Sequence, residues 1–350
     1  MDASVPPPTR PRHRPRGRRA LLLLVVGLLA LAAFETGRAL TPPEALRAGP
    51  RTVEVPPQSG LLDIARTLGE AQVIRSRGAF VALAVLRGTA RSLKAGEYEI
   101  PRAASLLMTL ELLETGKVKP HLLVLKEGFT VRELARQLEA EALVPTADLL
   151  RAAQNPDLAR NLGIAAEGLE GYLFPDTYQV TKGMRAEDIL GRMVQRFGEK
   201  IATPDVLGRA RDRGLTLHQL VTLASIIERE TGAREELPII AGVFWNRLKR
   251  DMPLQADPTV AYAVGKDGRA PSREDIQVDH PFNTYRYRGL PPGPIGNPGQ
   301  AAVEAALAPA AVPYLYFVAI DDRHHHFSAT LEEHNQAVAR YRQTRRSSTP

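Results

Sequence analysis

The feature that most constrains this chain is an apolar run close to its N-terminus. Residues 20–34, ALLLLVVGLLALAAF, contain no charged side chain. A helix of this length rises roughly 22 Å, which is shorter than the ~30 Å hydrocarbon core of a bilayer. The partly apolar continuation to Leu40 and the long side chain of Arg19 can make up the difference. We therefore predict a transmembrane helix over residues 20–40.

The charges before this run set the expected orientation. Residues 1–19 contain six arginines and one acidic residue, Asp2. Because basic flanks stay on the cytoplasmic side, we expect a cytoplasmic basic tail over residues 1–19 and export of everything after residue 40. The alternative is a cleaved signal peptide, since Ala30, Leu31 and Ala32 resemble a small-residue cleavage site. Both interpretations place the body of the protein outside the cytoplasmic membrane.

Charge and cysteine content exclude several classes of function. Most of the formal net charge of +7 lies in the basic tail, so the rest of the chain is nearly balanced and predicts no nucleic-acid partner. The absence of cysteine excludes a disulfide framework, a thiolate metal site and a thiol nucleophile. With 350 residues, of which 44% are hydrophobic, the chain is long enough for two or three domains.

The order of the sequence patterns predicts an α+β protein. Residues 41–52 read as a Pro-rich linker, and residues 53–139 as a small β-α-α-β module followed by a helix and strand unit. We expect a mixed α+β domain over residues 140–342 and a disordered polar tail over residues 343–350. In this second domain, helices are expected at 187–197, 216–231, 235–250, 259–264 and 301–307, before a closing strand at 314–320.

One predicted helix carries two candidates for acid/base chemistry. Residues 216–231, TLHQLVTLASIIERET, begin with a Thr-x-x-Gln capping box and show helical periodicity. Glu228 and Glu230 lie about 160° apart, at opposite margins of the apolar face, where partial burial raises a carboxyl pKa toward that of a general acid. The pattern does not choose between them, and it is equally typical of a boundary glutamate paired with arginine. The face expected to meet solvent contains His218, Thr222, Ser225 and Arg229.

A cluster of histidines near the C-terminus raises the question of a metal. His324, His325 and His326 are adjacent, and His334 follows. If the three adjacent residues form a strand, their side chains alternate between faces, so at most two point the same way. The chain also lacks the His-Glu-x-x-His spacing of a helical zinc site. We predict neither a metal nor a cofactor.

A series of ordered motifs then identifies a family. They are GLEGYLFPDTY (168–178), LASIIERET (223–231), VFWNRL (243–248), LQADPTVAYAVG (254–265), NTY (283–285), GLPPGPIGNPG (289–299), YLYFVA (314–319) and an H-x-F-S-x-T-x-x-x-H-N ending (325–335). Together they closely resemble the MltG/YceG-like endolytic murein transglycosylases of bacteria. KAGEYEIP (94–101) and KEGFTVREL (126–134) match the family more weakly, and the resemblance implies that the β-α-α-β module is LysM-like.

The resemblance implies a reaction and a catalytic residue. The family's catalytic glutamate is the second in its I-E-x-E-T pattern, which here is Glu230. The implied activity is non-hydrolytic cleavage, within peptidoglycan strands, of the β-1,4 bond between N-acetylmuramic acid and N-acetylglucosamine. The product ends in a 1,6-anhydro ring, so that one carboxyl suffices. Nascent glycan strands are the expected substrate, and cell-wall synthases or division proteins are candidate partners.

Other residues are candidates for contact with the sugars. Asp257 precedes Pro258 and reads as a helix N-cap, although substrate contact or a second catalytic role are alternatives. Aromatic and amide side chains suit pyranose rings and N-acetyl groups, which makes four further residues substrate-binding candidates: Asn246, Gln255, Asn283 and Tyr285. Glu170, Tyr172 and Asp176 are expected to brace the domain. The alternative functions are a non-catalytic peptidoglycan-binding scaffold and a muramidase that uses water, which would need a second carboxylate.

Overall fold

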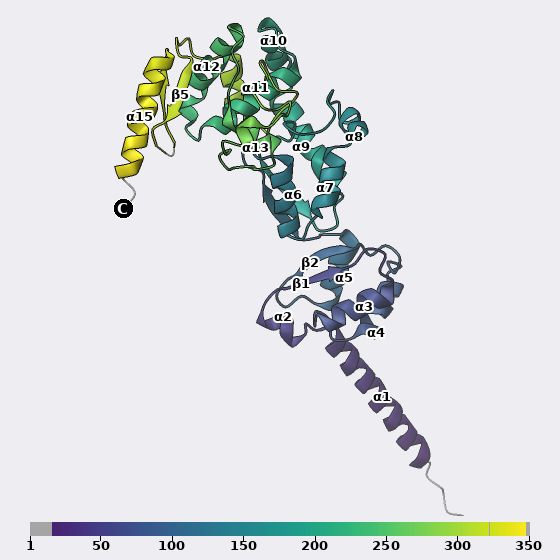
Figure 1. Ribbon diagram of the computed structural model, residues 1–350. Coiled ribbons are helices and arrows are strands. Elements are labelled where there is room, and N and C mark those ends of the chain that lie inside the picture. The colour runs from purple at the N-terminus through teal and green to yellow at the C-terminus, as the bar shows by residue number, and fades with distance from the viewer. Residues whose placement is uncertain (1–15, 322, 348–350) are drawn as a thin grey trace, which may run out of the picture. The chain divides into compact units, whose positions relative to one another are not determined.

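A computed structural model of the chain describes residues 16–321 and 323–347 (Figure 1). The chain divides into two compact units, Met1–Lys119 and Pro120–Pro350, and each contains its own cluster of buried hydrophobic side chains. Within the described residues, helices are combined with three two-stranded antiparallel sheets. The mixed α+β class predicted from the sequence is therefore confirmed.

The first unit has the expected β-α-α-β order. Its elements are β1 (Arg51–Val55), α3 (Leu61–Glu70), α4 (Arg77–Leu86) and β2 (Gly96–Ile100), followed by α5 (Leu106–Thr115). β1 and β2 pair antiparallel, with Val53 opposite Tyr98. Tyr98 and Phe80 are fully buried between the sheet and the helices of this unit. The order of elements is confirmed, whereas the LysM-like character of the module stays a prediction.

Residues 41–52 do not form a free linker. They contain the short helix α2 (Glu44–Ala48), and the Leu46 side chain is fully buried in the core of the first unit. The Leu46 carbonyl accepts a hydrogen bond of 2.9 Å from the Ala103 backbone N–H. The linker was predicted from its proline content alone. Burial of the single apolar side chain of Leu46 is enough to attach this segment to the core.

The apolar run near the N-terminus lies in α1 (Arg16–Leu40). Within the part of the chain that the structure describes, no helix combines the length and the apolar character required to cross a membrane. The transmembrane helix predicted over residues 20–40 is therefore not confirmed. Residues 1–15 of the predicted cytoplasmic tail lie outside the described residues.

The second unit contains most of the helices and the other two sheets. Its elements are β3 (Pro120–Val124), α6 (Val131–Ala140), α7 (Thr146–Ala153), α8 (Pro156–Asn161), β4 (Thr177–Thr181), α9 (Ala186–Lys200), α10 (Pro204–Asp212), α11 (Leu217–Glu230), η1 (Arg234–Glu236), α12 (Leu237–Lys249), α13 (Asp257–Ala263), η2 (Asp275–Gln277), α14 (Gln300–Leu307), β5 (Tyr316–Ala319), β6 (His325–Ser328) and α15 (Leu331–Ser347). β3 pairs antiparallel with β4, with Leu123 opposite Tyr178. Through this pairing β3 and α6, which the sequence pattern placed before residue 140, belong to the second unit.

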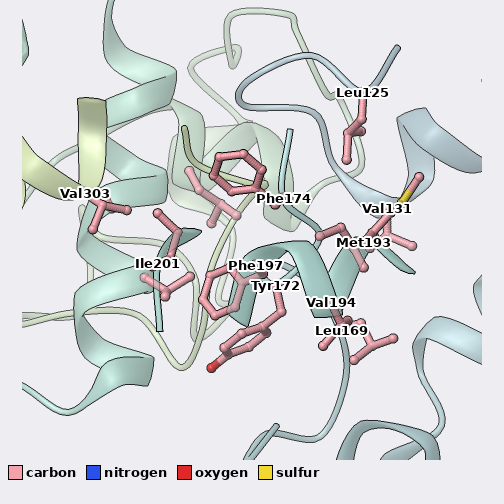
Figure 2. Close-up of a cluster of buried hydrophobic side chains, with 14 of the residues drawn as sticks. Leu125, Val131, Leu169, Tyr172, Phe174, Met193, Val194, Phe197, Ile201 and Val303 are labelled. Carbon is pink, nitrogen blue, oxygen red and sulfur yellow. The ribbon is translucent and has the colours of Figure 1, made fainter. Parts of the chain in front are cut away.

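The core of the second unit joins residues that lie far apart in the chain. Figure 2 shows Leu125, Tyr172, Phe197 and Val303 in one cluster of buried side chains, drawn from four different segments. The Tyr172 and Phe197 rings meet edge to face, with centroids 5.3 Å apart. Tyr172, which the sequence suggested as a brace, therefore packs in this core, with its hydroxyl 2.7 Å from His218 Nδ1.

The C-terminal segment forms a small sheet covered by a helix. β5 and β6 pair antiparallel, and α15 lies beside them (Figure 1). Because α15 ends at Ser347, residues 343–347 are helical, although the sequence pattern assigned them to a disordered tail. Arginine and glutamine have good helix propensity, so a polar segment here extends the preceding helix. Residues 348–350 lie outside the described residues.

The proline-rich loop at residues 289–299 covers one side of α11. The Ile295 N–H donates to Ser225 Oγ over 3.1 Å, and His218 Nε2 lies 2.8 Å from the Pro292 carbonyl oxygen. Thr222 and Ser225 are consequently buried, and the expectation that this face of the helix meets solvent is wrong for both. The helical periodicity places these polar side chains on one face of the helix. It does not show that the loop of residues 289–299, distant in the sequence, packs against that face.

Asn297 fixes this loop to two other segments. Its fully buried side chain donates from Nδ2 to the Phe129 carbonyl over 2.8 Å and accepts from the Leu173 N–H at Oδ1 over 2.9 Å. The Asn297 carbonyl also accepts from the Gly128 N–H over 2.8 Å. One amide side chain thus joins the loop to the turn before α6 and to the segment before β4.

Candidate active site

The side chain of Glu230 lies in the last turn of α11. The Thr216 and Gln219 capping box starts this helix as predicted, and the helix ends at Glu230 itself. Glu230 Oε1 is buried, and within the described part of the chain it has no hydrogen-bond partner. A buried, unpaired carboxyl oxygen is costly unless the group is neutral or a ligand reaches it.

The surroundings of Glu230 favour its protonated form. Burial raises the pKa of Glu230 to about 8; the negative charge of Asp257 also raises it, and the positive charge of Arg247 opposes both. At neutral pH the carboxyl therefore holds its proton in most molecules. The site contains the proton donor that general acid catalysis requires.

Arg247 supplies a fixed positive charge close to Glu230. This side chain of α12 is buried, and its Nε donates to the Leu315 carbonyl over 2.7 Å while Nη1 donates to the Leu254 carbonyl over 2.8 Å. The guanidinium also lies over the Tyr316 ring, 5.3 Å from its centroid. Burial lowers the pKa of Arg247, although the group is still charged at neutral pH. Its hydrogen bonds to two backbone segments hold it in place.

Asp257 and Tyr285 form a pair near the same carboxyl. The Tyr285 hydroxyl donates to Asp257 Oδ1 over 2.5 Å, and burial together with this hydrogen bond raises the pKa of Tyr285. Asp257 is exposed and is the first residue of α13, whose N-cap is Ala256 without a side-chain cap. The expectation that Asp257 caps this helix is therefore wrong. Its carboxylate is directed to Tyr285 and acts electrostatically on Glu230.

The three amide candidates differ in what their side chains contact. Asn246 Nδ2 donates to the Val312 carbonyl over 2.8 Å and to the Tyr314 carbonyl over 3.0 Å. Asn283 is fully buried, donates to two carbonyls of the preceding segment and accepts from the Tyr285 N–H over 3.0 Å. These contacts favour a bracing role for both asparagines, with Asn283 holding the turn that presents Tyr285. Substrate contact by either one stays a prediction.

Gln255 remains accessible beside the site. It is exposed, adopts a left-handed backbone conformation with φ of 49°, and its Oε1 accepts from Arg247 Nη1 over 3.4 Å. A non-glycine residue in this conformation is uncommon and stores strain, which is often found near functional sites. Gln255 and Asp257 are thus the two exposed polar candidates of this group.

Glu228 contacts a different part of the molecule. Its Oε2 accepts from the Gly299 N–H over 2.9 Å, at the end of the proline-rich loop. Burial raises its pKa and the nearby Glu127 adds to this, while the bond from Gly299 opposes the rise. The two glutamates have different surroundings, Gly299 for Glu228 and the charges of Asp257 and Arg247 for Glu230, which agrees with the prediction that they lie at opposite margins of the helix.

Sequence reasoning missed Arg247 as a part of this site. The signal was present, because Arg247 follows a mostly apolar stretch of α12 and a buried arginine requires specific partners. Its nearness to Glu230 depends on how α11 and α12 pack, which no local pattern specifies.

The C-terminal histidines lie in and next to the β5–β6 sheet, where His325 bonds to Glu236. His325 Nδ1 lies 2.7 Å from Glu236 Oε2, and the His325 N–H donates to Glu236 Oε1 over 2.9 Å. Across the described ranges, no group of three His, Cys, Asp or Glu side chains is placed to hold a metal ion. The expectation that no metal takes part stays a prediction.

Comparison with known proteins places this geometry in a family. The profile of the YceG-like family matches residues 53–340. The chain belongs to the YceG-like family. The resemblance found in the motifs is thereby confirmed over most of the chain, including both units.

Relatives of this YceG-like chain have been named for their activity. A Bacillus subtilis (strain 168) protein named endolytic murein transglycosylase is 32% identical over 305 residues, which cover 83% of this chain and 84% of that protein. A Streptococcus pneumoniae (strain D39) protein of the same name is 31% identical over 322 residues, and this chain spans 58% of its length. A crystal structure of a putative YceG-like protein from Listeria monocytogenes has 35% identity and a TM-score of 0.58, covering 82% of this chain and 98% of the other.

Proposed function

We propose that this chain is an endolytic lytic transglycosylase of peptidoglycan, with Glu230 as its acid and base. The observation that carries the proposal is a buried carboxyl oxygen to which none of the described residues hydrogen-bonds, in a group whose pKa is raised to about 8. The printed names of its relatives supply the substrate class. The product and the bond cleaved are part of the proposal.

In the proposed reaction one carboxyl performs both proton transfers. Protonated Glu230 donates to the glycosidic oxygen between N-acetylmuramic acid and N-acetylglucosamine as the bond to C1 breaks. The C6 hydroxyl of the muramic acid then attacks C1, and the Glu230 carboxylate accepts its proton. The new C1–O6 bond closes the 1,6-anhydro ring, and Glu230 is protonated again without consuming water.

The fixed charges around Glu230 suit this cycle. Asp257 favours the protonated acid before cleavage, and its carboxylate stabilises positive charge that develops at C1. Arg247 favours the Glu230 carboxylate in the second half of the reaction. Glu230 must both donate and accept a proton. The negative charge of Asp257 favours its protonated form, and the positive charge of Arg247 favours its ionised form.

A hydrolytic muramidase is the second candidate function. The observation that favours it is the carboxylate of Asp257 near Glu230. An enzyme that uses water needs a second carboxylate near the acid, and Asp257 is an exposed carboxylate that acts electrostatically on Glu230. The two candidates differ in their products, because hydrolysis leaves reducing ends and transglycosylation leaves anhydro ends.

Digestion of purified glycan strands followed by mass spectrometry of the ends tests the proposal. We expect anhydro ends from the wild type, none from Glu230→Gln, and anhydro ends at a reduced rate from Asp257→Asn. Reducing ends that disappear in Asp257→Asn would establish the muramidase. Binding of strands without any cleavage by the wild type would identify a scaffold.

We also propose that the enzyme acts on nascent strands outside the cytoplasmic membrane, held there by its N-terminal segment. The support is the arginine-rich tail followed by the apolar run of residues 20–34. We expect the full chain to fractionate with membranes, and a C-terminal tag to be digested by external protease in spheroplasts. A mature N-terminus at Ala33 would show instead that a signal peptide is cleaved.

A further inference from the structure

The second unit contains a cavity whose lining does not include Glu230. This cavity has a volume of about 700 Å³ and lies among the starts of α6 and α11, the ends of α7 and α13, and the turn before β4. The side chains that give it chemical character are Arg132, Gln154, Glu170, Tyr172, Tyr262 and Phe282. We call it the Tyr262 cavity. Neither catalysis at Glu230 nor the packing of the core requires a hollow of this size.

Two charged groups of the Tyr262 cavity, Arg132 and Glu170, are matched by protein partners, and a third, Glu167, lies at its exposed edge. Arg132 donates to both carboxylate oxygens of Asp267 over 2.9 Å, and the Asp267 side chain is 1% exposed. The Glu170 carboxyl accepts from the Val131 N–H over 3.1 Å and from Asn297 Nδ2 over 3.3 Å. Burial raises the pKa of Glu170 to about 8, so this carboxyl is mostly neutral at pH 7. Because the charges of Arg132 and Glu170 are matched and Glu167 is in contact with solvent, the interior of the cavity suits a neutral, polar ligand.

Aromatic rings form one wall of the cavity. The Tyr262 and Phe282 ring centroids are 5.1 Å apart, and the Arg132 guanidinium lies over the Tyr262 ring, 4.6 Å from its centroid. The C–H faces of a pyranose pack well on such rings, because both surfaces are flat and weakly polar. The exposed Gln154 places an amide at the rim, where it can hydrogen-bond to an N-acetyl group.

The cavity is joined to the Glu230 site by two shared elements. α13 begins with Asp257 at the Glu230 site and carries Tyr262 into the cavity, about 8 Å further along the helix axis. The turn after η2 places Phe282 in the cavity and, through the buried Asn283, presents Tyr285 to Asp257. The Glu230 site and the cavity thus share one helix and one turn, which makes a single strand that contacts both a reasonable hypothesis to test.

We propose that the Tyr262 cavity is a second saccharide-binding site, which takes an N-acetylated sugar of the same glycan strand that is cut at Glu230. The identity of the strand rests on the proposed function, whereas the preference for a neutral sugar rests on the cavity alone. Occupation of this site orients the strand before cleavage and makes long strands better substrates than short ones.

The experiment uses the full chain and a substitution that fills the cavity mouth. Ala165 lines the cavity and is exposed, so Ala165→Trp blocks it without disturbing the core; Ala140→Trp, at the exposed far end of α6, is the matched control. Each is placed in a Glu230→Gln chain, and hydrogen exchange is followed at residues 165–172 on addition of a tetramer of N-acetylglucosamine. We expect protection in the parent and in Ala140→Trp, and at least a tenfold weaker response in Ala165→Trp.

A kinetic measurement with Glu230 restored distinguishes this inference from the proposed function. We expect Ala165→Trp to raise KM for long strands about tenfold while kcat changes little, and Ala140→Trp to leave both unchanged. Protection that is absent at saturating tetramer, or identical in Ala165→Trp and its control, would overturn the inference and leave the role of Glu230 intact. A third outcome separates the two proposals. If Ala165→Trp loses the protection but the wild type cleaves no strands, the cavity is supported and the proposed function is refuted. If Ala165→Trp unfolds, Gln154→Ala gives the same readouts.

Discussion

Two buried glutamates of the second unit, Glu230 and Glu170, share one electrostatic property and differ in their partners. Burial raises the pKa of each to about 8. Glu170 has its carboxyl bonded to the Val131 N–H and the Asn297 amide, so it joins segments of the fold. Glu230 has a buried oxygen that accepts no hydrogen bond from residues 16–321 and 323–347. A raised pKa therefore indicates burial, and the absence of a partner is what distinguishes a carboxyl available for chemistry.

The largest effect is expected from removing the proton of Glu230. Glu230→Gln keeps the size of the side chain but cannot donate, so we expect strand cleavage to fall by at least 10²–10⁴-fold. The unfolding temperature should stay within a few degrees of the wild type, because the buried Oε1 accepts no hydrogen bond within the part of the chain that the structure describes. Steady-state cleavage and thermal unfolding of the same preparation check this. An active, folded Glu230→Gln would remove Glu230 from the reaction.

The corresponding change at Glu170 should affect stability. Glu170→Leu removes the acceptor for the Val131 N–H and the Asn297 amide, and each buried donor left unpaired costs about 1–3 kcal/mol. Urea unfolding measures the loss, with Glu230→Gln as the matched control. Equal stability of Glu170→Leu and the wild type would mean that Glu170 does not hold these segments together.

The raised pKa values of Glu230 and Glu170 should make the free energy of unfolding fall as pH rises. A glutamate with a raised folded-state pKa is protonated in the folded state while the unfolded state ionises, so unfolding becomes easier from about pH 4.5 to about pH 8. Glu230→Gln removes one of the two groups, and we expect a shallower decline of the unfolding free energy over this range. Chemical unfolding at several pH values checks it, and an unchanged slope would show that Glu230 ionises normally.

The rate should depend on pH through the same group. Cleavage requires protonated Glu230, so kcat/KM should decline as pH rises through about 8. Asp257→Asn removes a negative charge that raises this pKa, and we expect the decline to move to lower pH. A decline that stays in place in Asp257→Asn would show that Asp257 does not act on the acid.

The smallest effect is expected at the other margin of α11. Glu228→Gln keeps an oxygen that can accept from the Gly299 N–H, so we expect cleavage to drop less than about tenfold. The measurement is the same cleavage assay, alongside Glu230→Gln. A folded Glu228→Gln that is inactive while Glu230→Gln cleaves would exchange the roles of the two residues.

Local features of this fold could be predicted from the sequence. The capping box at Thr216 and the helical period predicted the position of α11. Both signals lie within a few residues of the structure that they specify. The pairing of β3 with β4 and the burial of Ser225 depend on segments far away in the chain, and no local pattern contains them.

The candidate site divides in the same way. Glu230 followed from the family motif, and its position at a helix margin followed from periodicity. Asp257 was expected to cap α13, but its carboxylate is directed to Tyr285, which approaches from another loop. Arg247 acts electrostatically on Glu230 because α12 packs beside α11, and the sequence pattern does not contain this packing. The sequence therefore predicted Glu230 as the acid, whereas the charges of Arg247 and Asp257 that act on its carboxyl follow from the tertiary structure.

The bonds of Asn297 have a consequence for the order of folding. The Leu173 N–H and the Phe129 carbonyl that its side chain joins lie 124 and 168 residues earlier in the chain. Closing loops of this length is entropically costly and tends to be late in folding. During synthesis, the loop that covers the polar side of α11 cannot be held by Asn297 until residue 297 has been added to the chain. A chain interrupted before that point presents Thr222 and Ser225 to solvent, and we expect quality-control proteases to recognise such intermediates at this helix.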